Sequence, residues 1–127
     1  MPALVLDAGA LIAADRDDRQ LLAKLRVAER SGLDLRSNGA VIAEVWREDG
    51  GRQARLARLL KAVEVVAVDE TLGRRAGGLL GKSATDDPVD ATVVAIAASG
   101  DHILTSDVSD IRKLVTASRR AVHVVRC

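Results

Sequence analysis

The sequence predicts an α/β protein in which a mostly parallel sheet of roughly five strands is covered by helices on both faces. Short apolar runs typical of buried strands alternate along the chain with longer segments whose apolar residues recur at helical spacing. Connections that alternate in this way are right-handed and place the strands parallel. The 127 residues suit a single domain, residues 1–127, because two separate cores of this length would each be marginally stable.

Two strands and one helix are predicted near the start of the chain. Residues 3–6 form a continuous apolar run, which suits a strand buried on both faces. Residues 8–14 follow without an assigned element, and apolar residues at helical spacing then predict a helix that ends at Gly32. Residues 33–37 have the weaker pattern of a second strand.

The middle of the chain is predicted to hold two short helices and a strand. Either Ser37 or Asn38 can cap a helix over residues 41–46, whose apolar residues lie at adjacent-turn spacing. A glycine pair at residues 50–51 separates this helix from a second, leucine-rich one. Residues 63–68 form the clearest strand after the first.

The helix with the clearest boundaries is predicted over residues 87–99. Asp87 is its N-cap candidate, Pro88 takes the first helical position, and Gly100 ends it. The other elements of this half are a helix over 71–81, a loop over 82–86, a strand over 102–105, a helix over 109–118 and a strand over 122–125.

The composition excludes several classes of protein. Apolar residues make up 48% and charged residues 29%, a balance typical of globular domains. The chain has neither a membrane-length apolar run nor a signal-peptide pattern, so we expect a cytoplasmic protein without a membrane partner. Cys127 is the only cysteine beside two histidines, which excludes an intrachain disulfide and argues against structural zinc.

Charge and aromatic content limit how the chain could bind nucleic acid. The net charge is only +1, but five cations between Arg47 and Lys61 face only Glu48 and Asp49. This basic segment suits phosphate contacts, although a solvated helix face explains it more simply. Trp46 is the only aromatic residue, so any RNA would be held by its phosphates and shape, without base-stacking platforms.

Three aspartates are expected at the sheet edge where open parallel sheets place their ligand sites. Asp7 directly follows the apolar first strand, where a charge is unusual unless it is paired or metal-bound. Asp107 follows the fourth strand. A helix that leads into a parallel strand starts at the same edge, which places Asp90 there too. These three carboxylates are therefore predicted to converge.

Structural roles compete with a functional one at each further acid. Asp87 is better explained as a helix cap, and Asp90 also suits the favourable dipole position of a first helical turn. Asp107 and Asp110 could both cap and charge the last helix, although the neighbouring acids favour a site role for Asp107 over Asp110. Glu44 lies at the border of an apolar stripe, and spacing alone does not select it.

Converging acids call for a cation. Two carboxylates about 4 Å apart repel by roughly 4 kcal/mol at an effective dielectric of about 20. Oxygen-only ligands favour Mg²⁺, with Mn²⁺ as a possible substitute. Such a metal can bind a phosphate oxygen and activate a water molecule for in-line attack. Hydrolysis of phosphodiester bonds is the reaction that this chemistry favours.

Four segments together resemble PIN domains, most closely the VapC-type toxins, over essentially the whole chain. Each segment is a weak motif alone, and their order and spacing are fairly specific. They are Leu-Val-Leu-Asp-Ala at 4–8, Ala-Glu-Val-Trp at 43–46, Asp-Pro-Val-Asp-Ala at 87–91 and Leu-Thr-Ser-Asp-Val-Ser-Asp at 104–110.

The resemblance implies a PIN-like fold with an acidic quartet that binds one or two Mg²⁺ ions directly or through water. The implied quartet is Asp7, Glu44, Asp90 and Asp107, with Asp7, Asp90 and Asp107 as metal ligands. It further implies an auxiliary acid and a hydroxyl that orients water or a carboxylate, the candidates being Asp110, Thr105 and Ser106.

The resemblance also implies endonucleolytic cleavage of RNA, a homodimer, and inhibition by a separate VapB-like antitoxin that covers the active site. Similar proteins usually carry Ser or Thr soon after the first aspartate. Here the sequence is Ala-Gly-Ala at 8–10, so this hydroxyl is missing and activity could be tuned by the change.

Three other readings fit the residues less well. A phosphohydrolase of the haloacid dehalogenase type needs a second acid two residues after Asp7, where Gly9 stands. A response-regulator receiver domain needs paired acids and a late lysine, and only Asp69 partly fits. A PIN-like scaffold that binds RNA or protein without catalysis is disfavoured because all four acids are present.

Overall fold

The computed structural model describes residues 2–48 and 50–127, and Asp49 of the basic segment lies outside these described residues. Five strands form one sheet in the order β3-β2-β1-β4-β5, and every pair is parallel. The strands are β1 Ala3–Leu6, β2 Asp34–Asn38, β3 Val63–Val66, β4 His102–Thr105 and β5 His123–Arg126. All five predicted strands are therefore confirmed, with small differences at their ends.

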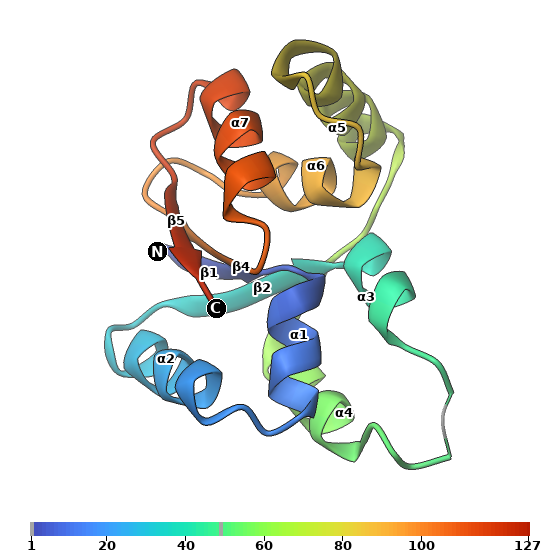
Figure 1. Ribbon diagram of the computed structural model, residues 1–127, viewed down its shortest axis with the longest axis vertical. Helices are drawn as coiled ribbons and strands as arrows, with labels where there is room; N and C mark the ends of the chain where they lie inside the picture. Colours follow the sequence, from blue (N-terminus) through green and yellow to red (C-terminus); the bar gives the residue numbers. More distant parts are fainter. Residues whose placement is uncertain (1, 49) are drawn as a thin grey trace.

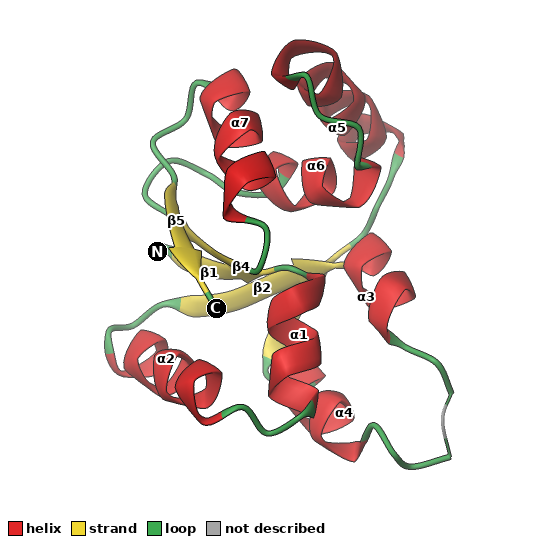
Figure 2. Cartoon of the chain, viewed as in Figure 1, coloured by secondary structure: helices red, strands yellow, loops and turns green. Residues whose placement is uncertain are grey.

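Helices cover both faces of this sheet (Figures 1 and 2). α5, α6 and α7 pack against one another on one face, and α1 packs against α2 and α4 on the other. α3 contacts both α1 and α6 beside the sheet. The helices are α1 Ala8–Asp15, α2 Arg19–Arg30, α3 Gly39–Val45, α4 Ala54–Leu60, α5 Glu70–Ser83, α6 Pro88–Ala95 and α7 Val108–Ser118. The predicted three-layer α/β/α architecture is confirmed.

The strand order reverses at the centre of the sheet. β1 is hydrogen-bonded to β2 on one side and to β4 on the other, with Leu6 level with Leu104. The chain leaves β1 and β4 toward opposite faces, since α1 follows one strand and α7 the other. Open α/β sheets bind ligands at such a switch point, beyond the carboxyl ends of the strands. Asp7 directly follows the end of β1, and Asp107 lies two residues after the end of β4.

Two ends of predicted elements differ because side-chain caps and pairing partners decide them. β3 ends at Val66 rather than residue 68, because its partner Asn38 is the last residue of β2 and caps α3. α5 continues to Ser83, two residues into the predicted loop, and stops where Ala84 adopts the left-handed conformation. Between Ser37 and Asn38, the structure selects Asn38 as the cap, with Ala40 and Val41 as donors.

The prediction of a helix over residues 87–99 is wrong at its end, because α6 stops at Ala95. Two side chains form hydrogen bonds with backbone groups that would form helical hydrogen bonds in a longer helix. The carboxylate of Asp101 accepts a hydrogen bond from the Ala98 N–H at 2.8 Å. The guanidinium of Arg120 donates to the carbonyls of Ala95 and Ala97 at 3.2 and 2.6 Å. A single sequence gives little sign of caps that come from other elements.

Asp101 is a buried charge at the amino end of β4, away from the predicted acids. Its side chain is 3% exposed and accepts hydrogen bonds from the N–H groups of Ala3 and Ala98, and Arg36 lies 3.5 Å from it. These bonds tie β1, β2 and the end of α6 to the start of β4. We therefore assign Asp101 a structural role.

Replacing this carboxylate should destabilise the fold strongly. We expect Asp101→Ala to lower the free energy of unfolding by about 3–5 kcal/mol, because it leaves the buried Ala3 N–H, the partly buried Ala98 N–H and Arg36 without this partner. Urea denaturation measures the change. Asp34→Ala, at an exposed position on β2, is the control and should change stability by under about 0.5 kcal/mol. Equal losses in the two variants would contradict this role.

Among the described residues, the helices are all too short or too polar to cross a membrane.

Candidate active site

Asp7 links β1 to α1 and is held from several sides. Its side chain is 3% exposed, although it follows the strand at the sheet edge. One carboxylate oxygen caps α1 by accepting a hydrogen bond from the Ala10 N–H at 2.8 Å. The other accepts a short hydrogen bond from the hydroxyl of Thr105, which is fully buried at the end of β4. Neighbouring strands therefore fix the position of this carboxylate.

Thr105 connects Asp7 to the loop that carries Asp107. Its hydroxyl donates to Asp7 and accepts a hydrogen bond from the Asp107 N–H at 2.9 Å. A threonine can make both contacts because its hydroxyl is a donor and an acceptor. Thr105 thus orients a carboxylate, whereas Ser106 beside it is exposed.

The surroundings of Asp7 oppose its negative charge on balance. Burial raises the pKa of this carboxyl above its usual value of 3.8, and the nearby charge of Asp107 adds to the effect. Hydrogen bonds from Thr105 and from the N–H groups of Ala10 and Ser106 partly counter this rise. A buried carboxylate with these surroundings would gain stability from a cation.

Asp90, Asp107 and Asp110 form the tightest acidic group. Each offers a carboxylate oxygen, and the three oxygens all lie within 4.8 Å of one another. Asp90 lies in the first turn of α6, while Asp107 caps α7 by accepting a hydrogen bond from the Asp110 N–H at 3.3 Å. The first turns of two helices from separate parts of the chain therefore meet here.

Asp90 shows the electrostatic cost of this group most clearly. The pKa of the Asp90 carboxyl is raised from 3.8 to about 7, first by burial and then by the charges of Asp87, Asp107, Asp7 and Glu44, in that order of importance. The other three acids of the implied quartet and Asp87 thus all raise the pKa of Asp90. Without a cation, the Asp90 carboxyl therefore holds its proton more tightly than an ordinary aspartate does.

Glu44 is exposed near the end of α3, and it too belongs to this electrostatic neighbourhood. Partial loss of contact with water raises the pKa of its carboxyl, the charges of Asp87 and Asp7 raise it further, and the charge of Arg47 lowers it. Asn38 holds α3 in place, because its buried side chain caps this helix and donates to the Thr92 hydroxyl of α6 at 3.1 Å. The contact between α3 and α6 brings Glu44 toward the other acids.

Asp87 and Asp110 contribute more to this site than the sequence predicts. Asp87 caps α6 through the N–H groups of Val89 and Asp90, as expected, yet its charge also acts on Asp90 and Glu44. The sequence favours Asp107 over Asp110, yet Asp110 completes the tight trio, which does not include Asp7. The spacing of three residues between Asp107 and Asp110, one helical turn, was the available signal.

Gly9 leaves space for the loop that follows β4. A Cβ atom on Gly9 would lie 2.1 Å from the Ser106 hydroxyl oxygen, 2.7 Å from the Ser106 Cβ and 3.4 Å from an Asp7 oxygen. The hydroxyl could rotate away, but the Cβ contact requires the backbone to move. Glycine is therefore needed here so that the residues before Asp107 can approach α1.

Filling this space should disturb the site without unfolding the protein. We expect Gly9→Ala to cost about 1–3 kcal/mol of stability, because overpacking forces the backbone to shift. Adding Ser106→Gly removes both close contacts and should restore at least half of the loss. Thermal melts of the single and double variants measure this coupling. Strictly additive effects of the two substitutions would contradict the proposed contact.

The donor set of this site fits a hard divalent cation. The trio and Asp7 offer carboxylate oxygens alone, which suit Mg²⁺ or Mn²⁺ and suit zinc poorly. Among the described residues, Lys113 forms an ion pair with this trio, and its Nζ lies 4.0 Å from one Asp110 oxygen. One ammonium group at that distance cannot neutralise the negative charge of this many carboxylates. A bound divalent cation would supply the missing positive charge.

The predicted basic segment lies away from these acids except at Arg47, whose charge lowers the pKa of Glu44. α4 packs near the far end of α1, where the Leu56 N–H donates to Asp15 at 3.2 Å. Arg55 lies 4.0 Å from Asp17 at this end, while Arg47 donates to the carbonyls of Ala43 and Trp46. Part of the segment thus makes local contacts within its own protein.

Comparisons with known proteins identify the fold. No protein-family model matches the sequence, and no curated protein matches it. The structure resembles that of VapBC2 from Rickettsia felis bound to a DNA fragment from their promoter, with a TM-score of 0.73, 11% identity and 98% coverage of both chains. It also resembles FitAcB from Neisseria gonorrhoeae, with a TM-score of 0.65 and 14% identity over 94% of this chain and 96% of the other. These likenesses show that the chain has a three-layer α/β/α, PIN-like fold.

Proposed function

We propose that this protein is a Mg²⁺-dependent endoribonuclease and the toxin of a VapBC-type toxin–antitoxin pair. The observation that carries the proposal is the meeting of acids at the switch point of the sheet. Asp90, Asp107 and Asp110 offer oxygens within 4.8 Å of one another. Asp7 is buried near them, since the charge of Asp107 raises the pKa of Asp7 and the charges of Asp107 and Asp7 raise the pKa of Asp90.

The placement of the acids supports the following roles. Asp7, Asp90 and Asp107 would hold the metal, with Asp110 as a further ligand because it completes the trio. Glu44 would act from the exposed side of the site, where a carboxylate can contact a bound water molecule. Thr105 would keep Asp7 in place rather than contact the substrate, since it is fully buried.

Bound Mg²⁺ would supply a Lewis acid for a phosphate oxygen and lower the pKa of a coordinated water. The protein's own contribution is a set of carboxylates fixed before substrate arrives. Asp7 and Asp107 are both held as helix caps, and the Thr105 hydroxyl joins them. Such fixed oxygens need little rearrangement during the reaction, which is how preorganised sites accelerate it.

RNA as substrate and an antitoxin as partner are supported by the resemblance of the four motifs to VapC-type toxins. The fold shared with a VapBC2 chain supports the same proposal. In this proposal a VapB-like antitoxin covers the acidic site and the toxin forms a homodimer. The adjacent reading frame and the mass of the purified complex would test these two points.

RNA cleavage tests the proposed activity directly. The purified chain is incubated with RNA in Mg²⁺, in EDTA, and in EDTA followed by excess Mg²⁺. We expect cleavage only when Mg²⁺ is present, and loss of cleavage in Asp7→Ala and Asp90→Ala prepared in parallel. Cleavage that persists unchanged in EDTA and in both variants would contradict the proposal. Binding of RNA without cleavage in any condition would favour the non-catalytic scaffold instead.

A further inference from the structure

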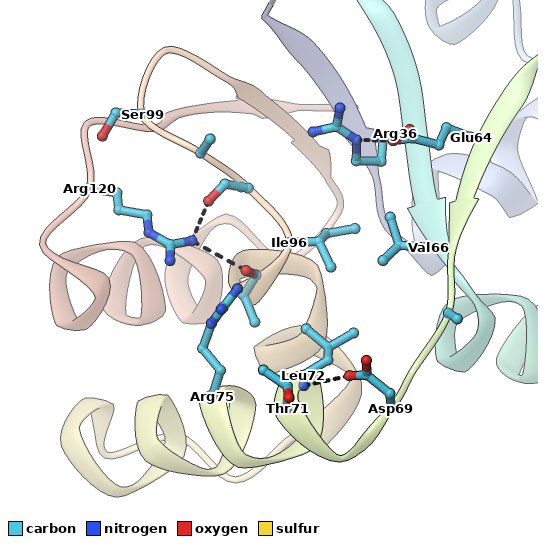
Figure 3. A pocket seen from close by; sticks show the side chains of 14 residues that line it. Arg36, Glu64, Val66, Asp69, Thr71, Leu72, Arg75, Ile96, Ser99 and Arg120 are labelled. Carbon is cyan, nitrogen blue, oxygen red and sulfur yellow. Dashed lines mark hydrogen bonds and ion pairs between the residues drawn. The ribbon is translucent and has the colours of Figure 1, made fainter.

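Arginine and lysine side chains line two cavities beside α5 and the end of α6, far from the acidic site. A cavity of about 600 Å³ lies between the sheet, the start of α5 and the end of α6 (Figure 3). A second cavity of about 270 Å³ adjoins it between α5 and the end of α7. Arg75 and Arg120 line both cavities, and we call the two together the basic groove. Its cations are Arg36, Arg74, Arg75, Lys82 and Arg120.

The acids of the basic groove are already engaged within the protein. Only Glu64 and Asp69 line it, both in the larger cavity. Glu64 pairs with Arg36 at 2.5 Å, and Asp69 caps α5 by accepting a hydrogen bond from the Leu72 N–H at 2.9 Å. Two of the five cations are engaged as well, because Arg36 also lies 3.5 Å from Asp101 and Arg74 pairs with Glu70 at 2.7 Å. The positive charge in excess therefore comes from Arg75, Lys82 and Arg120.

Arg75 and Arg120 are the central cations of this groove. In Figure 3 their side chains extend toward each other, Arg75 from α5 and Arg120 from the segment after α7. Arg120 is fixed by the carbonyls of Ala95 and Ala97, which bind one guanidinium nitrogen and leave others available. Arg75 and Lys82 are exposed, and no ion pair with an acid is found for either in the described part of the chain. Like charges gathered in this way favour an anion between them.

The lining of the groove indicates which part of an anion it would contact. No aromatic residue lines either cavity among the described residues, so bases would find no stacking surface. Guanidinium groups suit phosphates, since their planar donors match phosphate oxygens. Two adjoining cavities also suit an extended chain of phosphates better than one compact ion. A nucleic-acid backbone fits these features.

The groove and the acids lie at opposite ends of the same helices. Asp107 precedes α7 and Arg120 follows it, and this helix of 11 residues spans about 16 Å. Asp87 caps the start of α6, whereas Ala95 at its end lines the groove. A strand bound in the groove would therefore lie several nucleotides away from the bond at the acids.

We propose that the basic groove binds the sugar-phosphate backbone of the RNA strand, as an anchor distant from the acidic site. The choice of RNA among polyanions rests on the proposed function, whereas the anion site itself rests on the groove. The contacts are to phosphates, so the anchor is independent of base sequence. It would let a nuclease with a single tryptophan hold a strand without stacking.

Binding measured without cleavage tests this anchor. A fluorescein-labelled, 15-nucleotide single-stranded RNA is titrated with protein in EDTA, at several salt concentrations, and fluorescence anisotropy reports binding. The test variant combines Arg75→Gln with Lys82→Gln. The control combines Arg19→Gln with Arg26→Gln, two exposed positions on α2 at the other face of the sheet. Both variants lose two positive charges, and glutamine preserves helix propensity.

We expect the groove variant to bind RNA at least about tenfold more weakly than the wild type at low salt, and the control less than about twofold. Two lost phosphate contacts on a single strand should also reduce the slope of log affinity against log salt by about 1.4. Equal effects in the two double variants would overturn the proposal. It would also be overturned if ATP, at equal phosphate concentration, displaced the RNA as well as unlabelled RNA does.

The anchor and the proposed function can fail separately. If RNA is cleaved in Mg²⁺ but both double variants bind it like the wild type, the anchor is wrong and the nuclease stands. If the groove variant alone loses RNA binding while no condition gives cleavage, the anchor stands and the proposed catalysis is wrong.

Discussion

We expect Asp7→Asn to reduce Mg²⁺-dependent RNA cleavage by at least about 100-fold while the protein remains folded. Asparagine keeps an oxygen that can accept the Ala10 N–H bond, so the cap of α1 survives. The substitution removes the negative charge, which a metal ligand at this position requires, and the oxygen that accepts the Thr105 hydroxyl bond. Initial rates of cleavage, measured with saturating Mg²⁺, give the ratio.

The control for this prediction is Asp18→Asn. Asp18 caps α2 by accepting a hydrogen bond from the Leu21 N–H at 3.0 Å, so it has the same local role as Asp7 away from the acidic site. We expect this control to cleave RNA within about twofold of the wild type, and both variants to keep their stability within about 1 kcal/mol. Equal loss of activity in the two variants would mean that capping explains the effect.

We expect Asp90→Asn to have opposite effects on stability and activity. Without metal at pH 8, the variant should be more stable than the wild type by about 1–2 kcal/mol, after allowance for the partial exposure of Asp90. This corresponds to a melting temperature higher by about 5 °C. RNA cleavage should fall by at least about 100-fold, because the same charge that destabilises the fold is needed to hold the metal.

The pH dependence of this stability difference follows from the direction of the pKa shift. Asp90 has a pKa of about 7 in the folded protein and 3.8 as its usual value. The folded state therefore keeps a proton that the unfolded state loses as the pH rises from about 4 to about 7. The wild type loses stability over this range and no more above it, so the advantage of Asp90→Asn should grow from about pH 4 and level off above about pH 7.

Metal should reverse this advantage. In excess Mg²⁺ at pH 8 the wild type should gain stability and the variant should gain less, because the ion binds the deprotonated acids. Thermal melts of the wild type and of Asp90→Asn, each in EDTA and in Mg²⁺, measure these changes. An unchanged melting temperature in all four samples would contradict the close packing of these acids.

The sequence predicted the sheet well because its strands depend on local pattern. β1 and β4 are short apolar runs that are almost fully buried, and the order of helices and strands implied that they are parallel. The end of α6 could not be predicted in the same way. It depends on Asp101 and Arg120, which reach the helix from other parts of the chain.

The candidate site was predictable in part for the same reason. Asp7, Asp90 and Asp107 could be placed from strand ends and helix direction alone, and the structure gathers them at one edge of the sheet. Glu44 needed the resemblance, because the packing of α3 on α6 depends on the buried contact between Asn38 and Thr92 rather than on spacing. The match between Gly9 and Ser106 likewise exists only in three dimensions.

Titration calorimetry with Mg²⁺ tests most directly whether the acids form a metal site. The wild type, freed of metal with EDTA and dialysed, is titrated beside Asp90→Asn and the control Asp18→Asn. The account predicts saturable binding to the wild type and to the control, and binding to Asp90→Asn that is at least about tenfold weaker. Equal Mg²⁺ affinity in all three proteins, or no binding to the wild type at millimolar Mg²⁺, would contradict it.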